Sequence, residues 1–146
     1  MDYCSAGKMD ALYSLGIPEY MGVDNELIYY YQEIQKRFPN ISILYSTKRE
    51  VISASSNQLV GTLWMDQTYY ESQVHFMDPI MDRVGGGDAF SGGFLHGILV
   101  QKAPQEIINF ATAASALKHT VHGDCNQFSE SEVESFLAAG SGKIIR

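Results

Sequence analysis

The sequence predicts an α/β fold, in which amphipathic helices alternate with short apolar strands. Apolar side chains recur at the three- and four-residue spacing of a helix at Leu27, Tyr30, Tyr31, Ile34 and Phe38. Ile41–Tyr45 is short, apolar and rich in β-branched residues, which is typical of a buried strand. Three consecutive glycines, Gly85–Gly87, stand directly before another helical pattern, as in loops that lead into a helix.

Helix boundaries are marked in the first half of the chain. A short helix is expected at Met9–Leu15, because Gly16 is a normal stop signal and Pro18 follows it. Asp24 can cap the second helix, since an aspartate side chain accepts from the free N–H groups of the first turn.

The strands of the middle region follow from their apolar, β-branched composition. Thr47–Glu50 is expected to be a polar loop at the end of the strand Ile41–Tyr45. Gln58–Met65 and Tyr69–Phe76 are predicted to be two further strands, which can pair as a hairpin.

Asp88 begins a helix that contains two glycines four residues apart, Gly93 and Gly97. A glycine inside a helix costs about 1 kcal/mol relative to alanine. Such a cost indicates that another element packs closely against that face.

Two more helices complete the chain. Pro104 is at a favoured first-turn position, and the helix it starts contains the small-residue stretch Phe110–Leu117. Ser129 and Glu132 form a capping box that opens a last helix to about Ala138. Residues 1–146 are therefore expected to form a single domain.

Composition excludes several classes of function. The net charge of −7 argues against broad nucleic-acid binding, which needs basic patches. No apolar run is long enough to span a bilayer. Cys4 and Cys125 have no metal-ligand spacing, and two free thiols in a reducing compartment are expected. With no basic segment and apolar run at the N-terminus, the sequence predicts a cytoplasmic protein without membrane or nucleic-acid partners.

The glycine run predicts an anion site. Successive N–H groups in such a turn form an anion nest, and the helix dipole adds partial positive charge at the same point. Asp88, ionised beside these donors, could accept a proton from a substrate hydroxyl, which is what phosphoryl transfer requires. The alternative is that Asp88 serves only as a helix N-cap, the commonest role of an aspartate before a helix.

Other motifs are excluded by their spacing. The third glycine of a dinucleotide fingerprint would fall on Phe90, and Gly92-Gly93-Phe94 replaces the Gly-Lys-Ser/Thr of a P-loop. His119 and His122 are three apart without a carboxylate partner, so a solvated helix end is expected there and no metal site.

A longer string identifies a family. Asp82–Phe90 (DRVGGGDAF) closely resembles the second signature of PfkB-family carbohydrate kinases, which usually reads D-T-x-G-A-G-D-x-F. Here Arg83 replaces the usual Thr and Gly86 the usual Ala, as in the branch that phosphorylates 2-keto-3-deoxygluconate. Phe110–Thr120 resembles that family's adenine-pocket helix, and Ser46–Trp64 resembles that branch's nucleotide-loop region.

The resemblance implies a ribokinase-like α/β fold, of which this chain would be the C-terminal portion, a partial three-layer αβα arrangement. It implies an ATP-dependent phosphorylation of a small sugar or keto-deoxy sugar acid. Asp88 would be the general base, Gly85, Gly86 and Gly87 the anion hole, and Asp124 would hold the sugar acid.

The same resemblance implies ATP as co-substrate, accompanied by Mg²⁺, with no metal ligand assigned to the chain itself. Thr47 and Arg49 would meet the nucleotide phosphates, and Ala113 would line the adenine site.

Members of the family are considerably longer, and the match covers their C-terminal half. The chain is therefore expected to be a fragment or half of a split protein, inactive in isolation, whose partner is the missing N-terminal half or a further copy of itself. The alternative function is a truncated, catalytically inactive nucleotide-binding or interaction module. The identity of the sugar is left open, because the half that contacts it is absent.

Overall fold

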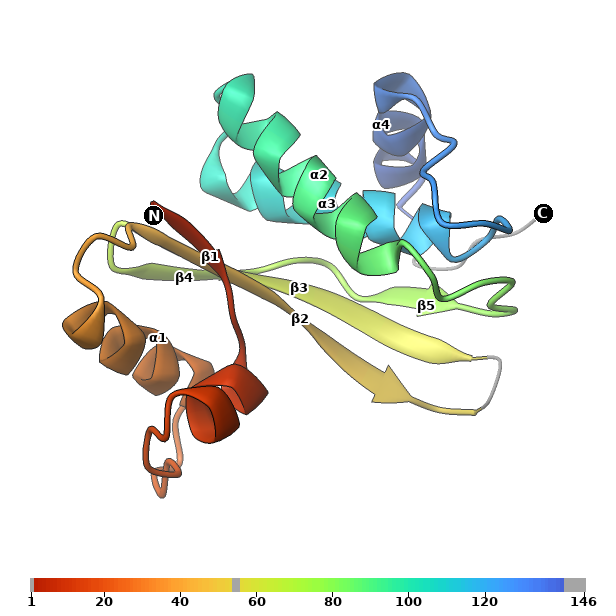
Figure 1. Ribbon diagram of the computed structural model, residues 1–146. Helices are drawn as coiled ribbons and strands as arrows, with labels where there is room; N and C mark the ends of the chain where they lie inside the picture. The colour runs from red at the N-terminus through yellow and green to blue at the C-terminus, as the bar shows by residue number, and fades with distance from the viewer. Residues whose placement is uncertain (1, 54–55, 141–146) are drawn as a thin grey trace. The chain divides into compact units, whose positions relative to one another are not determined.

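The structure is a computed structural model that describes residues 2–53 and 56–140, and its strands form a mixed sheet (Figure 1). In spatial order the described strands are β1 (Tyr3–Ser5), β2 (Ile43–Val51), β3 (Asn57–Met65) and β4 (Thr68–Glu71), with β5 (His75–Met77) also on β3. β1 runs parallel to β2, and β5 runs antiparallel to β3. The helices are η1 (Asp10–Ser14), α1 (Glu26–Arg37), α2 (Gly86–Leu99), α3 (Pro104–Lys118) and α4 (Glu130–Ala138).

The chain divides into two compact units, to which β2 and β3 both contribute. The first unit comprises Met1–Ser46 and Thr62–Tyr70, and the second comprises Thr47–Gly61 and Glu71–Arg146. The single domain expected from the sequence stays a prediction. Within the described ranges, every helix is too short or too polar to cross a membrane.

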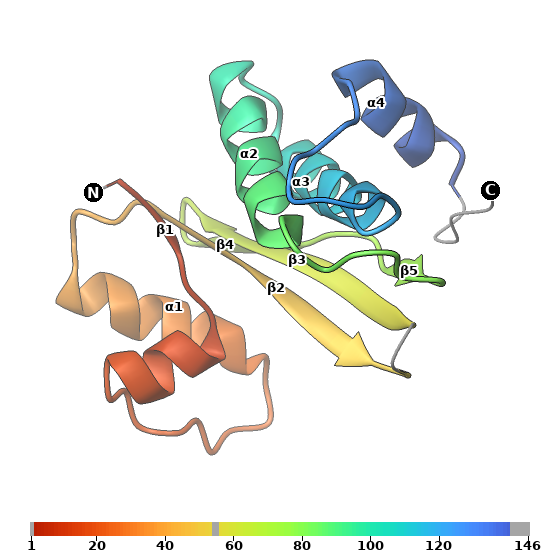
Figure 2. The ribbon, with the colours of Figure 1, turned by 45° about the vertical axis from the view of Figure 1, so that its right-hand side comes forward.

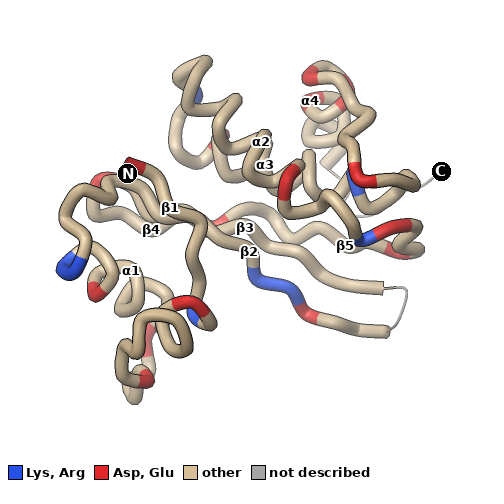
Figure 3. The backbone as a smooth tube through the Cα atoms, viewed as in Figure 1, with Lys and Arg blue, Asp and Glu red and all other residues tan. Residues whose placement is uncertain are grey.

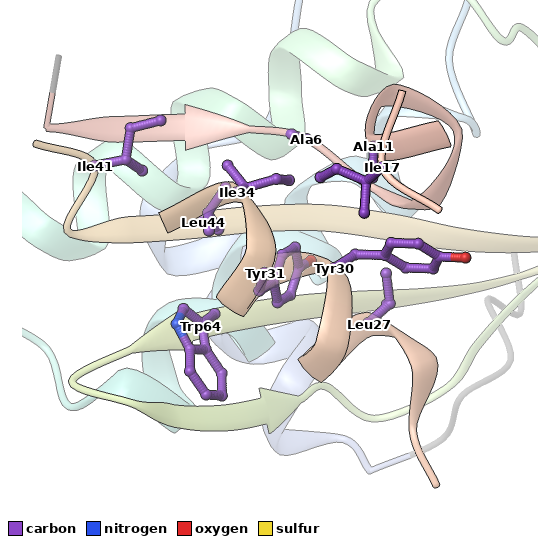
Figure 4. Close-up of a cluster of buried hydrophobic side chains, with 10 residues drawn as sticks. All are labelled: Ala6, Ala11, Ile17, Leu27, Tyr30, Tyr31, Ile34, Ile41, Leu44 and Trp64. Atoms are coloured by element: carbon purple, nitrogen blue, oxygen red, sulfur yellow. The ribbon is translucent and has the colours of Figure 1, made fainter. Parts of the chain in front are cut away.

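The core of the first unit is built around aromatic side chains of α1 (Figure 4). The hydroxyl of Tyr31 lies 2.8 Å from both Ser46 Oγ and Thr62 Oγ1, so its one polar atom is satisfied in the core. Trp64 is 3% exposed, and its indole N–H donates to Gln35 Oε1 at 2.7 Å. The aromatic side chains Tyr30 and Tyr31 of α1 therefore serve core packing.

The two helices of the first unit, η1 and α1, differ in detail from those expected from the sequence. η1 has the wider turn of a π-helix, with Leu15 N donating to Asp10 O at 3.0 Å, and the chain leaves it through Gly16 at φ +61°. The prediction that Asp24 caps the next helix is wrong. Asn25 is the cap, since its Oδ1 accepts from Leu27 N at 3.0 Å, and Asp24 therefore lies one residue outside the helix.

The prediction of a loop at Thr47–Glu50 is also wrong, because β2 continues to Val51. All five residues 47–51 are exposed, so they carry no apolar alternation that could reveal a strand. Backbone pairing with the neighbouring strand β3 holds them extended.

The hairpin after β3 is confirmed, although its second strand is broken into β4 and β5. Asp66 and Gln67 form its two-residue turn with φ of 51° and 59°. Positive φ at both central residues matches the twist of the flanking strands.

The second unit is organised by α2 and α3, which lie side by side in Figures 1 and 2. A Cβ added at Gly93 would lie 2.8 Å from Ala111 Cα, and one added at Gly97 would lie 3.0 Å from Ile107 Cγ1. The close packing that the two glycines predicted is confirmed. The capping box of α4 is also present, with Ser129 N donating to Glu132 Oε2 at 2.8 Å.

His75 is a buried histidine of the second unit without polar partners. It is 3% exposed, neither ring nitrogen has a hydrogen-bond partner, and its ring stacks on Phe136 with 5.3 Å between centroids. Burial lowers the pKa of His75 to about 4. The folded protein therefore holds this ring neutral at neutral pH.

Gly93→Ala is expected to destabilise the protein by about 1–3 kcal/mol, because its methyl group would collide with the backbone of α3. Gly92→Ala is the matched control. It lies on the same helix with nothing within 4 Å of an added Cβ, and it should stabilise the protein by up to about 1 kcal/mol. Urea denaturation of both variants measures the difference, and equal effects would contradict the packing described.

The effect of burial on His75 should be visible in how stability changes with pH. The His75 ring takes up its proton near pH 6.5 in the unfolded chain and near pH 4 in the folded chain. The contribution of this ring to stability should therefore fall between these pH values by at most roughly 3 kcal/mol, and it should change no further below pH 4. His75→Phe should lose less stability than the parent between pH 7 and 4.5 in urea titrations. His122→Gln, at an exposed position, is the control and should behave like the parent.

Candidate functional site

α2 begins directly at the glycine run. Gly85 adopts the left-handed conformation, with φ 77°, and precedes the first helical residue, Gly86. Ala89 N donates to Gly85 O at 2.9 Å, which closes the first turn. The N–H groups of Gly86, Gly87 and Asp88 therefore have no acceptor within the helix and are free to bind an anion.

Asp88 is the third residue of α2, so its interpretation as the N-cap is wrong; Gly85 has that position. The side chain is exposed, and within the described ranges no hydrogen bond or ion pair involves it. The first turn of α2, whose acidic residue is Asp88, is red in the backbone view of Figure 3. An exposed carboxylate beside free N–H donors has the placement that a proton acceptor needs.

A second loop is held against the glycine run. A Cβ added at Gly85 would lie 1.9 Å from the carbonyl oxygen of Asp124, so the two backbones touch. Asp82 ties the loops together, because it accepts from Val84 N and from Gly123 N, each at 3.0 Å. These two hydrogen bonds keep the pKa of the Asp82 carboxyl below its usual value. The structure thus brings Asp124 to the glycine run, and its role toward a sugar acid stays a prediction.

Asp88 and Asp124 line one cavity of about 320 Å³. Its walls come from α2, α3, α4 and the loop before α4, and include Gly92, Phe110 and Asn126. Carboxylates accept hydrogen bonds and repel phosphate. The cavity is therefore suited to a hydroxyl-bearing molecule, whereas the free N–H groups of α2 are suited to a phosphate.

Three cations are near enough to His119 to influence its pKa. Burial lowers the pKa of His119, and the nearby charges of Arg49, Lys118 and Arg83 lower it further against a hydrogen bond to the Ser115 carbonyl. Arg49 is exposed on β2, within the blue segment of that strand in Figure 3. Lys118 is fully buried, and its Nζ donates to Val121 O at 3.4 Å. These cations favour an anionic ligand.

None of the three predicted nucleotide contacts lines the cavity of Asp88. Thr47 is exposed on β2, two residues before Arg49, and neither residue lines the cavity of Asp88. Ala113 is fully buried in a cluster with Phe110 and Val133, and it does not line that cavity either. Their roles toward a nucleotide stay predictions.

The expectation of a solvated helix end at His119 is wrong, because this residue is 1% exposed. The chain turns at the end of α3, and the ring packs beneath Gly86. Sequence reasoning also gave no role to Ser115, whose hydroxyl donates to Gly86 O at 2.8 Å. The four-residue spacing of Ser115 and His119 on one helix was the available signal.

The described residues contain no cluster of three or more side chains of the kinds that ligate metals. The carboxylates of the cavity fit a Mg²⁺ ion that is bound together with a nucleotide, because phosphates and waters supply most ligands of such an ion and the protein supplies one or two carboxylates. Asp88, Asp124 and Glu130 are the carboxylates of the cavity. Asp88 and Asp124 would take that part, because Glu130 lies 3.1 Å from His96 Nε2. Cys4 and Cys125 are free thiols.

Comparison with known proteins shows the family of the chain. The family model described as pfkB family carbohydrate kinase matches residues 24–131. Among curated proteins, the 2-dehydro-3-deoxygalactonokinase of Haloferax volcanii is 38% identical over 79 residues, which are 54% of this chain and 24% of that protein. The chain thus spans about a quarter of this relative's length.

Solved structures show the fold class. A PfkB family carbohydrate kinase from Listeria grayi is 47% identical, with a TM-score of 0.86, and the match covers 94% of this chain and 41% of that one. The 2-dehydro-3-deoxygluconokinase of Thermotoga maritima is 32% identical, with the same TM-score and the same coverage. The expected α/β, ribokinase-like fold is confirmed, for a chain that spans about two fifths of these relatives.

Proposed function

The chain belongs to the pfkB family of carbohydrate kinases, and we propose that it is the nucleotide-binding and catalytic part of an ATP-dependent kinase for a small sugar or keto-deoxy sugar acid. One observation carries the proposal. The carboxylate of Asp88 is exposed and has no hydrogen-bond or ion-pair partner among the described residues, at the same helix end where the N–H groups of Gly86 and Gly87 have no intrahelical acceptor.

The reaction divides between these two groups. The free N–H groups of α2 bind the oxygens of the transferring phosphoryl group, whose negative charge the helix dipole also favours. Asp88 accepts the proton of the acceptor hydroxyl while that oxygen attacks the γ-phosphorus. The bond from the γ-phosphorus to the bridging oxygen breaks, and ADP leaves with that electron pair.

The sugar lies on the acidic side of the site. Asp124 accepts hydrogen bonds from sugar hydroxyls in the cavity that it shares with Asp88. The acceptor class is supported by relatives named as kinases of 2-dehydro-3-deoxygluconate and 2-dehydro-3-deoxygalactonate. Contacts from the part of those relatives that this chain does not span would complete the sugar site.

ATP lies on the basic side of the site. Arg49, whose charge reaches His119 beside the glycine run, pairs with the nucleotide phosphates, and Thr47 precedes it on the same strand. Bound Mg²⁺ neutralises charge on the β- and γ-phosphates. Ala113 is assigned to the adenine side because its helix, α3, includes the segment that resembles the family's adenine-pocket helix.

Asp88→Asn tests the base in a chimera that joins the preceding part of the Listeria grayi relative to this chain. Asn keeps the side-chain size and loses the proton acceptor, so kcat should fall by about 10²–10⁴. The melting temperature should change little, since a first-turn charge contributes only about 0.3–1 kcal/mol. Asp66→Asn, in the turn before β4, is the control and should leave kcat unchanged. A variant that keeps more than about half of its activity would remove Asp88 as the base.

The 146-residue chain alone should show little or no turnover of 2-keto-3-deoxygluconate with ATP, because positioning of the acceptor supplies much of phosphoryl-transfer catalysis. A coupled ADP-release assay measures this, with the chimera as the positive control. Robust turnover by the chain alone would contradict the need for further sugar contacts. ATP binding without turnover in the chimera would favour the alternative of an inactive nucleotide-binding module.

A further inference from the structure

A hydrogen bond from α3 fixes the direction of one peptide group in the anion site. Ser115 Oγ donates to the carbonyl oxygen of Gly86 at 2.8 Å, and both residues are buried. The Gly86 carbonyl and the Gly87 N–H belong to the same planar trans peptide, so they point in opposite directions. A hydrogen bond that holds the carbonyl toward α3 therefore holds the Gly87 N–H toward the exposed side.

His119 fills the space beside the same glycine. A Cβ added at Gly86 would lie 2.4 Å from His119 Cε1 and 2.9 Å from its Nε2. The Nδ1 atom lies 2.7 Å from the carbonyl oxygen of Ser115, which can only accept, so Nδ1 carries the proton. Ser115 therefore binds both groups: its hydroxyl donates to Gly86 and its carbonyl accepts from the ring of His119.

Gly86 is needed for its space, and the usual signature of the family has alanine at this place. In this chain the ring of His119 occupies the space that the methyl group of an alanine would need. The Nε2 atom of this ring is buried and has no hydrogen-bond partner among the described residues, which is unfavourable.

We propose that Ser115 and His119 are positioning residues of the anion site. The hydroxyl of Ser115 orients the peptide between Gly86 and Gly87, and the ring of His119 packs against Gly86 so that this peptide keeps one conformation. The catalytic part of this inference rests on the proposed function, whereas the packing part does not.

A double-mutant cycle on the 146-residue chain tests the packing. Gly86→Ala should lower the melting temperature by on the order of 5 °C, because the methyl group overlaps the ring. His119→Ala should also lower it, by emptying the space. In the double variant the methyl group enters that space, so it should melt no lower than His119→Ala alone. Additive losses would overturn the inference.

Gly87→Ala combined with His119→Ala is the matched control. Nothing lies within 4 Å of a Cβ added at Gly87, so these two changes should be additive. Coupling as large as in the first pair would show that the cycle reports a general loss of order and would overturn the specific contact.

Ser115→Ala tests orientation by a milder change. In glycine-labelled ¹⁵N–¹H spectra of the 146-residue chain, the Gly87 amide peak should shift, since its peptide loses the hydrogen bond that holds it. Ser72→Ala removes another buried hydroxyl, which accepts from Gly61 N at 2.8 Å, and should leave the Gly87 peak in place. A Gly87 peak that does not respond to Ser115→Ala would overturn the orienting role.

The kinetic arm uses the chimera. Ser115→Ala should lower kcat about tenfold and change KM for ATP less than about threefold, because the anion site acts on the group in transfer. Ser72→Ala should change neither. Unchanged kcat for Ser115→Ala in an active chimera would overturn the positioning role. A chimera without turnover would count against the proposed function alone, and the cycle and the spectra would then decide this inference.

Discussion

The antiparallel contact of α2 with α3 is the constraint on which the site depends. Gly97 meets Ile107, Gly93 meets Ala111, and Gly86 meets both Ser115 and His119. The four residues of α3 follow one another at intervals of four, and thus lie on one face of that helix. A register fixed by backbone contact at Gly93 therefore also decides which side chains of α3 reach the glycine run. Gly93 and Gly97, which lie outside the glycine run, thereby help to set the geometry of the proposed anion site.

Charges of both signs lie close to the glycine run, although the net charge of the chain is −7. Asp88 and Asp124 line one cavity, and the charges of Arg49, Lys118 and Arg83 lower the pKa of the His119 ring, which packs against Gly86. The charge of Lys118 also acts on Asp82 and Cys125, so the cations are not separated from the acidic loop. In the proposed reaction the cations and the free N–H groups of α2 would act on the phosphate charge, and Asp88 would act on the acceptor hydroxyl.

Local signals predicted most of the fold and a candidate site. Helical periodicity predicted α1, and the glycine run with Asp88 predicted an anion site, because each signal lies in neighbouring residues. The structure confirms both helices, whereas anion binding at the start of α2 stays a prediction. The failures have another cause. The exposed strand of residues 47–51 depends on pairing with β3, and the burial of His119 depends on a turn that places it beneath Gly86. Both depend on contacts distant in sequence, which a residue pattern does not contain.

The three glycines of the run are explained in three different ways. Gly85 needs a positive φ and touches the carbonyl of Asp124, and Gly86 needs the space that the ring of His119 occupies. Gly87 meets neither condition: its φ lies outside the left-handed region, and nothing lies within 4 Å of an added Cβ. Alanine there would be the better helix residue by about 1 kcal/mol. The fold itself gives no reason for this glycine, whereas close approach of a ligand to its exposed N–H does.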